Sequence, residues 1–430
     1  MSLGPIQLLK KRTFLPLFLT QFFGAFNDNA FKFAMLTLIS YHLSSTQTQS
    51  EFYQAIASAL FIIPFFLFSA TAGQLADKLN KAKITQIIKV FELGLMAMGG
   101  FALYFGHTWL MLVTLTGMGI HSSFFGPIKY AILPDLLPPP QLLGATALIE
   151  ASTFLAILLG TVLGSLSIAG IKWGSLYAIV LIGLAATAGL IASLFLLPTK
   201  PLATDLKIDW NPWRATLSMV RQISQHEGVM VAIFAISWFW LIGAVMLTKL
   251  PDYTNYILRA DASVFTVFLA LFSIGIALGS MAINYLLAGK TTLRYVPHAM
   301  ILLSLFAADI YWASPVQANA APLQPFAEFF KYMVHWRIAI DLFLLAFSGG
   351  LFVVPLYTYL QVASNDIMRA RTIAANNIIN AFFIVIGTCL VMLLLHLQVA
   401  IPQVFFILAL LNLLVACIFY FVYLQRLGCS

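Results

Sequence analysis

The chain has 430 residues, of which 61% are hydrophobic and only 9% are charged. An average soluble domain carries about 25% charged residues, so this composition excludes a soluble globular protein and indicates an integral membrane protein. The formal net charge of +8 comes without a nucleic-acid motif. We attribute it to basic loops that orient the spans, and we expect no nucleic-acid partner.

Apolar runs of roughly 20 residues, the length of a transmembrane helix, recur along the chain, whereas a barrel would show short alternating strands. The first half holds six predicted spans, which are 14–41, 53–76, 85–105, 109–133, 142–168 and 174–197. A charged segment with three prolines, 198–228, follows and is expected to link two halves. The second half holds six more spans, which are 229–256, 263–288, 294–313, 336–361, 370–397 and 402–425.

These spans predict an all-α membrane protein with twelve transmembrane helices in two six-helix bundles, over 1–197 and 229–430, joined by a cytoplasmic linker over 198–228. Twelve spans are typical of a transporter built from two repeats, with its substrate site between them near the midplane. If the N-terminus is cytoplasmic, fifteen of the 23 Lys and Arg residues fall on the inside and four on the outside. The excess of inside bases predicts that both termini are cytoplasmic. The remaining four, Lys32, Lys89, Lys129 and Lys249, fall within spans and are candidates for function.

The first predicted span has a polar centre made of Asn27, Asp28, Asn29 and Lys32. A carboxylate in the middle of a bilayer is costly unless it faces a wet cavity or a partner. We therefore interpret Asp28 as part of a transport pathway. The alternative is a local ion pair between Asp28 and Lys32, four residues apart on one helix face, which only neutralises both charges.

The loop after the second span reads Gly73-Gln-Leu-Ala-Asp77-Lys78 and is followed by further bases. A glycine near the end of a helix allows close approach of a neighbour, and an aspartate can face the positive N-terminus of another helix. This loop resembles the conserved loop motif of the major facilitator superfamily, with Asn80 where that family usually has glycine. The resemblance implies a conformational role for Gly73, Asp77 and Lys78. The alternative is a solvated basic loop.

Two more spans of the first half carry ionisable groups. Span four ends with Gly126-Pro-Ile-Lys129-Tyr130, where glycine and proline weaken the helix and Lys129 either serves the substrate or extends to the cytoplasmic surface. Span five carries Glu150 about two turns inside, followed by Gly160 and Gly164 at the spacing of a helix-packing face. The charges suit a zwitterionic cargo, and a closed structural network of salt bridges is the alternative.

The second half offers fewer candidates. Trp240, in the run Ser237-Trp-Phe-Trp240, presents an aromatic face that could hold an ammonium group, although membrane tryptophans also serve as interfacial anchors or core. Asn377 belongs to a group of three asparagines in span eleven, which bind either a headgroup or neighbouring helices. Lys249 and Asp252 lie near an outer span end.

Four segments together resemble the bacterial lysophospholipid transporter family, in particular the module that is often fused to an acylglycerophosphoethanolamine acyltransferase. They are Gln21–Lys32, Phe125–Tyr130, Glu150–Gly160 and Gly350–Leu356. The resemblance implies a flippase that moves lysophospholipids, such as lysophosphatidylethanolamine, across the bacterial inner membrane to the cytoplasmic leaflet for reacylation. Because the sequence ends at Ser430, we expect an acyltransferase, where one takes part, to be a separate partner. The family's arginine in span seven aligns with Leu247 here.

We therefore expect lysophospholipid and membrane lipids as partners, with Asp28, Asn29, Lys32, Lys129, Tyr130, Glu150, Trp240 and Asn377 at the substrate site. No nucleotide-binding loop, catalytic triad or metal-ligand spacing occurs in the sequence, so we expect no enzymatic activity, cofactor or metal. Two rival functions remain. One is a major facilitator carrier of another solute, a siderophore or a drug, in which Asp28 or Glu150 takes up a proton. The other is a scaffold that only recruits an acyltransferase.

Overall fold

The computed structural model describes residues 4–168, 174–315 and 322–422, and these residues contain helices and no strand. The long helices of the first half are α2 (Leu15–Leu38), α3 (Gln47–Lys78), α4 (Lys81–Phe105), α5 (Thr108–Ala131), α7 (Pro139–Ile168) and α8 (Gly174–Leu194). Those of the second half are α10 (Glu227–Asp252), α11 (Ala262–Leu286), α12 (Val296–Ala313), α14 (Met333–Ala363), α15 (Arg369–His396) and α16 (Ile401–Val422). The short elements are α1 (Pro5–Leu8), α6 (Leu133–Leu136), α9 (Pro212–Ile223), α13 (Phe326–Phe329), η1 (Ile39–Leu43), η2 (Tyr253–Ile257) and η3 (Asp366–Met368).

Each predicted span coincides with one of these long helices, so the all-helical prediction is confirmed. Ten helices in the described part of the chain are long and apolar enough to cross a membrane. The other two, α2 and α5, have 24 residues each, and polar side chains within them lower their mean hydropathy. The exact count of twelve spans stays a prediction.

The segment predicted as a plain linker contains a helix, α9. Pro212 opens it at the first helical position, where its missing N–H costs nothing. The side-chain oxygen of Asn211 caps the helix by accepting hydrogen bonds from the backbone N–H groups of Trp213 and Arg214, both at 3.1 Å. The helix packs against α3. The prolines of this segment were expected only to break helices, so α9 was not predicted.

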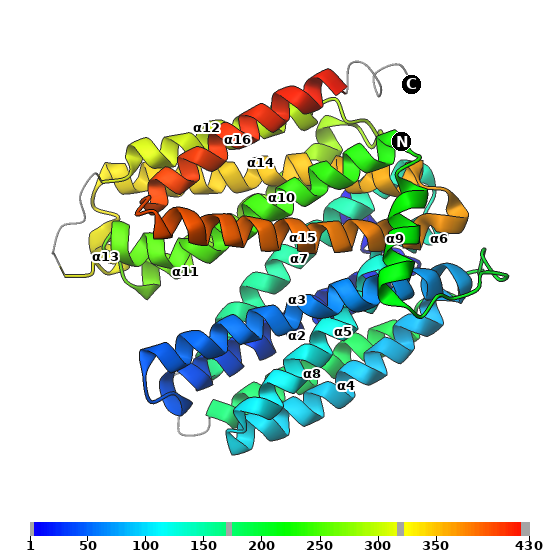
Figure 1. The fold of residues 1–430 in the computed structure, drawn as a ribbon, viewed down its shortest axis with the longest axis horizontal. Coiled ribbons are helices and arrows are strands. Elements are labelled where there is room, and N and C mark those ends of the chain that lie inside the picture. Colours follow the sequence, from blue (N-terminus) through cyan, green and yellow to red (C-terminus); the bar gives the residue numbers. More distant parts are fainter. Residues whose placement is uncertain (1–3, 169–173, 316–321, 423–430) are drawn as a thin grey trace. The chain divides into compact units, whose positions relative to one another are not determined.

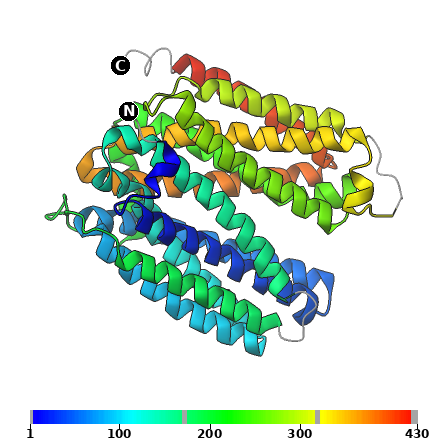
Figure 2. The same cartoon turned by 180° about the vertical axis from the view of Figure 1, so that it is seen from behind.

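The chain folds into two compact units. The first comprises Met1–Ala145, Leu155–His226 and Leu360–Ile378, and the second comprises Thr146–Phe154, Glu227–Tyr359 and Ile379–Ser430. In the first unit, α2 packs against α8, α4 against α5 and α8, and α3 against α5 (Figure 1). In the second, α12 and α16 run side by side, as the red and yellow-green ribbons show from behind (Figure 2), and α10 packs against α11 and α16. The predicted boundary at 198–228 stays a prediction.

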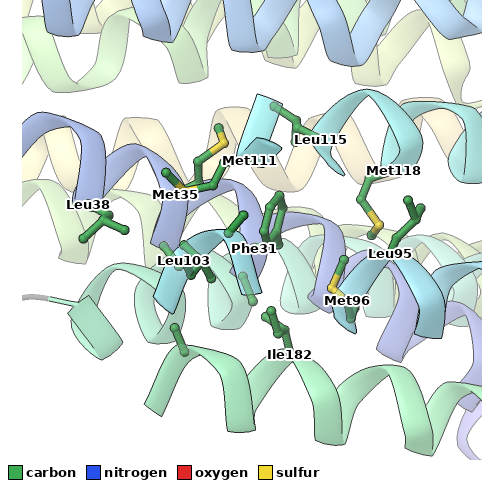
Figure 3. Packing of buried hydrophobic residues seen from close by; sticks show 14 of the residues in the cluster. Phe31, Met35, Leu38, Leu95, Met96, Leu103, Met111, Leu115, Met118 and Ile182 are labelled. Carbon is green, nitrogen blue, oxygen red and sulfur yellow. The ribbon is translucent and has the colours of Figure 1, made fainter. Parts of the chain in front are cut away.

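The core of the first unit holds α2 in place. Phe31 and Met35 of α2 lie among Met111 of α5, Met96 of α4 and Ile182 of α8, all buried (Figure 3).

The C-terminal half of α7 approaches α2 at two glycines. A Cβ atom built on Gly160 would lie 3.0 Å from the backbone nitrogen of Ala30, and one on Gly164 would lie 2.9 Å from the Cα of Ala30. These contacts confirm the packing role predicted for both glycines. Packing on several sides fixes the orientation of α2 and therefore of its polar centre.

Candidate functional site

Asp28 of α2 is partly exposed, and its Oδ2 atom accepts a hydrogen bond of 2.6 Å from the hydroxyl of Ser122 on α5. Its other oxygen, Oδ1, is buried and has no hydrogen-bond partner among the described residues. A carboxylate with one satisfied and one unsatisfied oxygen is suited to bind a further donor. The ammonium group of a headgroup would be such a donor.

Lys32 follows Asp28 by one turn on the same face of α2 and is also partly exposed. Its ammonium nitrogen lies 5.9 Å from the ring centre of Phe61 and 6.0 Å from that of Phe33. The ion pairs found among the described residues do not include one between Lys32 and Asp28, although the two charges interact electrostatically. The geometry thus favours two separate charges over the closed local pair.

Asn29, the third predicted residue of this group, uses its side chain locally. Its Nδ2 atom donates a hydrogen bond of 2.8 Å to the carbonyl of Ala25, one turn earlier in α2. Its Cβ would lie 3.0 Å from a Cβ atom on Gly160. These contacts give Asn29 a packing role in the structure described, and its substrate role stays a prediction.

A buried charge cluster includes Asn27, the residue before Asp28 on α2. We define the cluster as Asn27, Lys89, Glu92 and His121. The ammonium of Lys89 lies 2.6 Å from Oε2 of Glu92, and Nε2 of His121 lies 3.1 Å from the same oxygen. Asn27 donates a hydrogen bond of 2.8 Å to the other carboxylate oxygen. Lys89, Glu92 and Asn27 are fully buried, and His121 is 2% exposed.

Glycine makes room for Lys89 in this cluster. A Cβ atom on Gly24 of α2 would lie 2.6 Å from the Lys89 ammonium nitrogen, and one on Gly189 of α8 would lie 3.4 Å from it. The same nitrogen lies 5.5 Å from the ring centre of Phe125, at a cation–π distance. The helices around Lys89 are therefore shaped to accept a buried charge.

Lys89 is recognisable in the sequence as an intramembrane base, whereas Glu92 and His121 were not among the predicted functional residues. The spacing of Lys89 and Glu92, three residues apart in a predicted helix, was a usable signal because such residues share a face. His121 gave no such signal, since its contact with Glu92 depends on how α4 packs against α5.

The end of α5 brings together three other predicted residues. The Lys129 ammonium nitrogen lies 4.8 Å from the ring centre of Tyr130, which is only 1% exposed. A Cβ atom on Gly126 would lie 2.7 Å from Nδ2 of Asn377, so this glycine allows α15 to approach α5. Asn377 and Lys129 are both partly exposed.

Glu150 of α7 and Trp240 of α10 both belong to the second unit. Glu150 is fully buried, and Phe154, one turn later in α7, stacks against the ring of Trp240 with centres 6.2 Å apart and planes at 16°. The indole N–H of Trp240 donates a hydrogen bond of 2.8 Å to the hydroxyl of Tyr357. Phe154 therefore covers one face of Trp240, and the indole N–H of Trp240 is occupied by its hydrogen bond to Tyr357.

The asparagines of α15 have different partners. Asn380 accepts a hydrogen bond of 2.7 Å from the buried hydroxyl of Ser237. Asn376 is fully buried, and neither of its amide atoms has a hydrogen-bond partner in the described part of the chain. The interhelical role considered for this group is thus seen at Asn380.

The motif residues Gly73 and Asp77 meet the start of α15 within the first unit. The carboxylate of Asp77 accepts backbone N–H groups from Ala370 at 2.9 Å and Arg371 at 3.2 Å, and it pairs with Nε of Arg371 at 3.0 Å. A Cβ atom on Gly73 would lie 2.7 Å from Cβ of Ala374. Asp77 therefore caps a helix N-terminus, where a negative charge is favourable.

Asn80, which departs from the usual glycine, has a local role. Its side chain caps α4 by accepting N–H groups from Ala82 at 3.0 Å and Lys83 at 3.3 Å. The departure therefore adds a helix cap without altering the contacts of Asp77. Lys78, the last residue of α3, is partly exposed beside it.

Gly73→Val is expected to lower transport by tenfold or more at an unchanged membrane level, because its side chain would collide with α15. Backbone and Cβ atoms at under 3 Å cannot give way without moving a helix. Gly94→Val is the matched control, since Gly94 lies in a span helix and has open space around it. Equal transport by both variants would show that close approach of α3 and α15 is not needed.

No group of His, Cys, Asp or Glu within the described ranges could hold a metal ion.

Comparisons with known proteins identify the family of this chain. Residues 17–388 match the model of the Major Facilitator Superfamily. The lysophospholipid transporter LplT of Serratia proteamaculans is 27% identical over 375 residues, which cover 86% of this chain and 85% of that protein. LplT of Yersinia pestis (strain Pestoides F) is 27% identical over 378 residues, covering 86% and 84%.

Solved structures share the fold at low sequence identity. The human organic anion transporter MFSD10 (TETRAN) superimposes with a TM-score of 0.77 at 15% identity, covering 95% of this chain and 99% of that one. A bacterial homologue of the iron transporter ferroportin in an outward-facing state gives a TM-score of 0.67 at 14% identity, covering 96% and 99%. The fold, the apolar helices and the family match lead to one conclusion: this chain is a multi-pass membrane transporter that belongs to the major facilitator superfamily.

Proposed function

We propose that this chain moves lysophospholipids across the bacterial inner membrane to the cytoplasmic leaflet, where an acyltransferase reacylates them. One observation carries the proposal: Asp28 and Lys32 present opposite charges one turn apart on α2, and both residues are partly exposed. A zwitterionic headgroup supplies the complementary pair of charges. The names of the similar relatives support a lysolipid as the cargo.

In this mechanism the phosphate of the lysolipid meets Lys32 or Lys129, and its ammonium group meets Asp28 or Glu150. The acyl chain remains along phenylalanine-rich helix faces or in lipid. Two helical halves, divided at the linker 198–228, rock against each other and expose the headgroup to each side in turn. Both termini lie in the cytoplasm, as the distribution of basic residues favours.

A reconstituted flip assay tests this function. Purified protein in vesicles receives fluorescent lysophosphatidylethanolamine, the matching diacyl lipid, or a small hydrophilic solute. We expect the lysolipid to cross at least tenfold faster than in protein-free vesicles and the other two to show no such increase. Preferential movement of the hydrophilic solute would instead favour a carrier of another solute, and no movement of any of the three would favour a scaffold.

A further inference from the structure

The short helix α9 has apolar side chains on two sides. Its inner side, which packs against α3, consists of three buried residues, Ala215, Met219 and Ile223. Trp213 and Leu217 lie on the outer side and are 67% and 73% exposed. Trp210, just before the helix, is 70% exposed. Large apolar side chains exposed together mark an interaction surface.

Two arginines lie beside the exposed apolar residues of α9. Arg214 and Arg221 are each within one turn of Leu217, and both are exposed. The Nε atom of Arg214 lies 3.3 Å from a carboxylate oxygen of Asp209, yet the arginine side chain remains 83% exposed. α9 itself contains no acidic residue. Tryptophan and leucine flanked by bases are typical of a helix that lies on an anionic membrane surface.

α9 lies at the height where the spans end. It runs across the end of α3 rather than along it (Figure 1). Oε1 of Gln74, one turn before the last residue of α3, accepts a hydrogen bond of 2.8 Å from the backbone N–H of Asp209, just before α9. The chain leaves span α8 at Leu194 and begins span α10 at Glu227, soon after α9 ends. The exposed apolar residues are therefore placed at the level of lipid headgroups.

The segment before α9 is attached to the part of α3 that carries the loop motif. The backbone N–H of Ala203 donates a hydrogen bond of 3.2 Å to the carbonyl of Asp77. The hydrogen bond between Asp209 and Gln74 forms a second attachment, one turn away. The carboxylate of Asp77 in turn pairs with Arg371 at the start of α15. A contact that fixes α9 therefore also fixes the end of α3.

We propose that the outward face of α9, defined as Trp213, Arg214, Leu217 and Arg221, binds the anionic lipid surface of the cytoplasmic leaflet. The inference rests on the cytoplasmic placement of 198–228 in the proposed function and not on the identity of the cargo. Trp213 and Leu217 insert between headgroups, and the two arginines contact lipid phosphates. The occupant is lipid because the face combines apolar and basic groups at the level of the span ends. This contact anchors the end of α3, and with it Asp77, to the leaflet.

Fluorescence quenching in vesicles tests where this face lies. The three cysteines are replaced by serine, and a fluorescent label is attached at Leu217→Cys in the full chain. The control label is at Gln222→Cys, an exposed position of α9 about 140° around the helix from Leu217. Quenchers are a nitroxide lipid and iodide, the latter on both sides of the membrane. In vesicles with about a third phosphatidylglycerol, we expect the nitroxide lipid to quench the label at Leu217 at least about threefold more than the control label.

The contribution of the arginines is tested by changing both of them. Arg214→Gln with Arg221→Gln should lower nitroxide-lipid quenching at Leu217 by about threefold to tenfold, because each base near an anionic surface adds to the attraction. Vesicles of phosphatidylcholine alone should give a similar decrease without the substitutions. Lys331→Gln, which neutralises an exposed base of the second unit, should leave the quenching unchanged.

Three outcomes would overturn the proposal. Strong iodide quenching at Leu217 would mean that water covers this face. Protection of the label from both quenchers would mean that a second copy of the chain covers it. Lipid quenching that changes neither with phosphatidylglycerol nor with the two arginines would show that the face does not recognise an anionic surface. Because no lysolipid is present, these results are independent of whether the flip assay supports the proposed function.

Discussion

Asp28→Ala is expected to reduce transport of lysophosphatidylethanolamine by about tenfold to a hundredfold, because hydrogen bonds to a charged group are worth roughly 1.5–3 kcal/mol. The Oδ1 atom of Asp28 lacks a hydrogen-bond partner in the described chain and is the acceptor we assign to the headgroup ammonium. Removing the carboxylate removes this acceptor and also the hydrogen bond that the hydroxyl of Ser122 donates to Asp28. Initial rates of lysolipid uptake in reconstituted vesicles measure the effect.

Asp205→Ala is the control for this experiment, because Asp205 is an exposed carboxylate in the segment between α8 and α9. Both variants must be present in the membrane at equal amounts. A rate for Asp28→Ala equal to that of the control would remove Asp28 from the substrate site.

Glu92→Ala is expected to destabilise the protein strongly, by about 3–5 kcal/mol, since removing one partner of a buried ion pair leaves an uncompensated charge. Lys89 is fully buried, and its ammonium lies 2.6 Å from the lost carboxylate. Asn27 and His121 lose their contact with Glu92 as well. Thermal unfolding in detergent should show the variant melting well below the wild type.

The double variant Lys89→Met with Glu92→Leu separates charge from packing. Replacing both partners of a buried pair by apolar residues of similar size is often close to neutral. We therefore expect it to recover most of the stability that Glu92→Ala loses, although its transport should remain impaired. If Glu92→Ala were as stable as the wild type, water would have to reach Lys89, contrary to its burial.

Local patterns in the sequence predicted much of the fold. Apolar runs gave the positions of the long helices because crossing a bilayer requires about 20 apolar residues wherever they occur. The packing glycines Gly160 and Gly164 were also recognisable from spacing alone. In contrast, α9 was missed because Pro212 can end a helix or open one, and its capping partner Asn211 decides which.

The site was predicted only where a single helix determines it. Asp28 and Lys32 stood out because charge within a span is rare. The partner of Asp77 could not be predicted, since Arg371 is 294 residues away in sequence. The contact of His121 with Glu92 likewise depends on tertiary packing between α4 and α5. Charges in a span are visible in sequence, but their partners are not.

The central claim is that Asp28 recognises the positive charge of the cargo headgroup. Transport of lysophosphatidylethanolamine and of lysophosphatidate, which lacks the ammonium group, should therefore be compared in wild-type and Asp28→Ala vesicles. The account predicts that the substitution slows the first lysolipid at least tenfold more than the second. Equal slowing of both lysolipids would contradict it, because Asp28 would then support the transporter without recognising the headgroup.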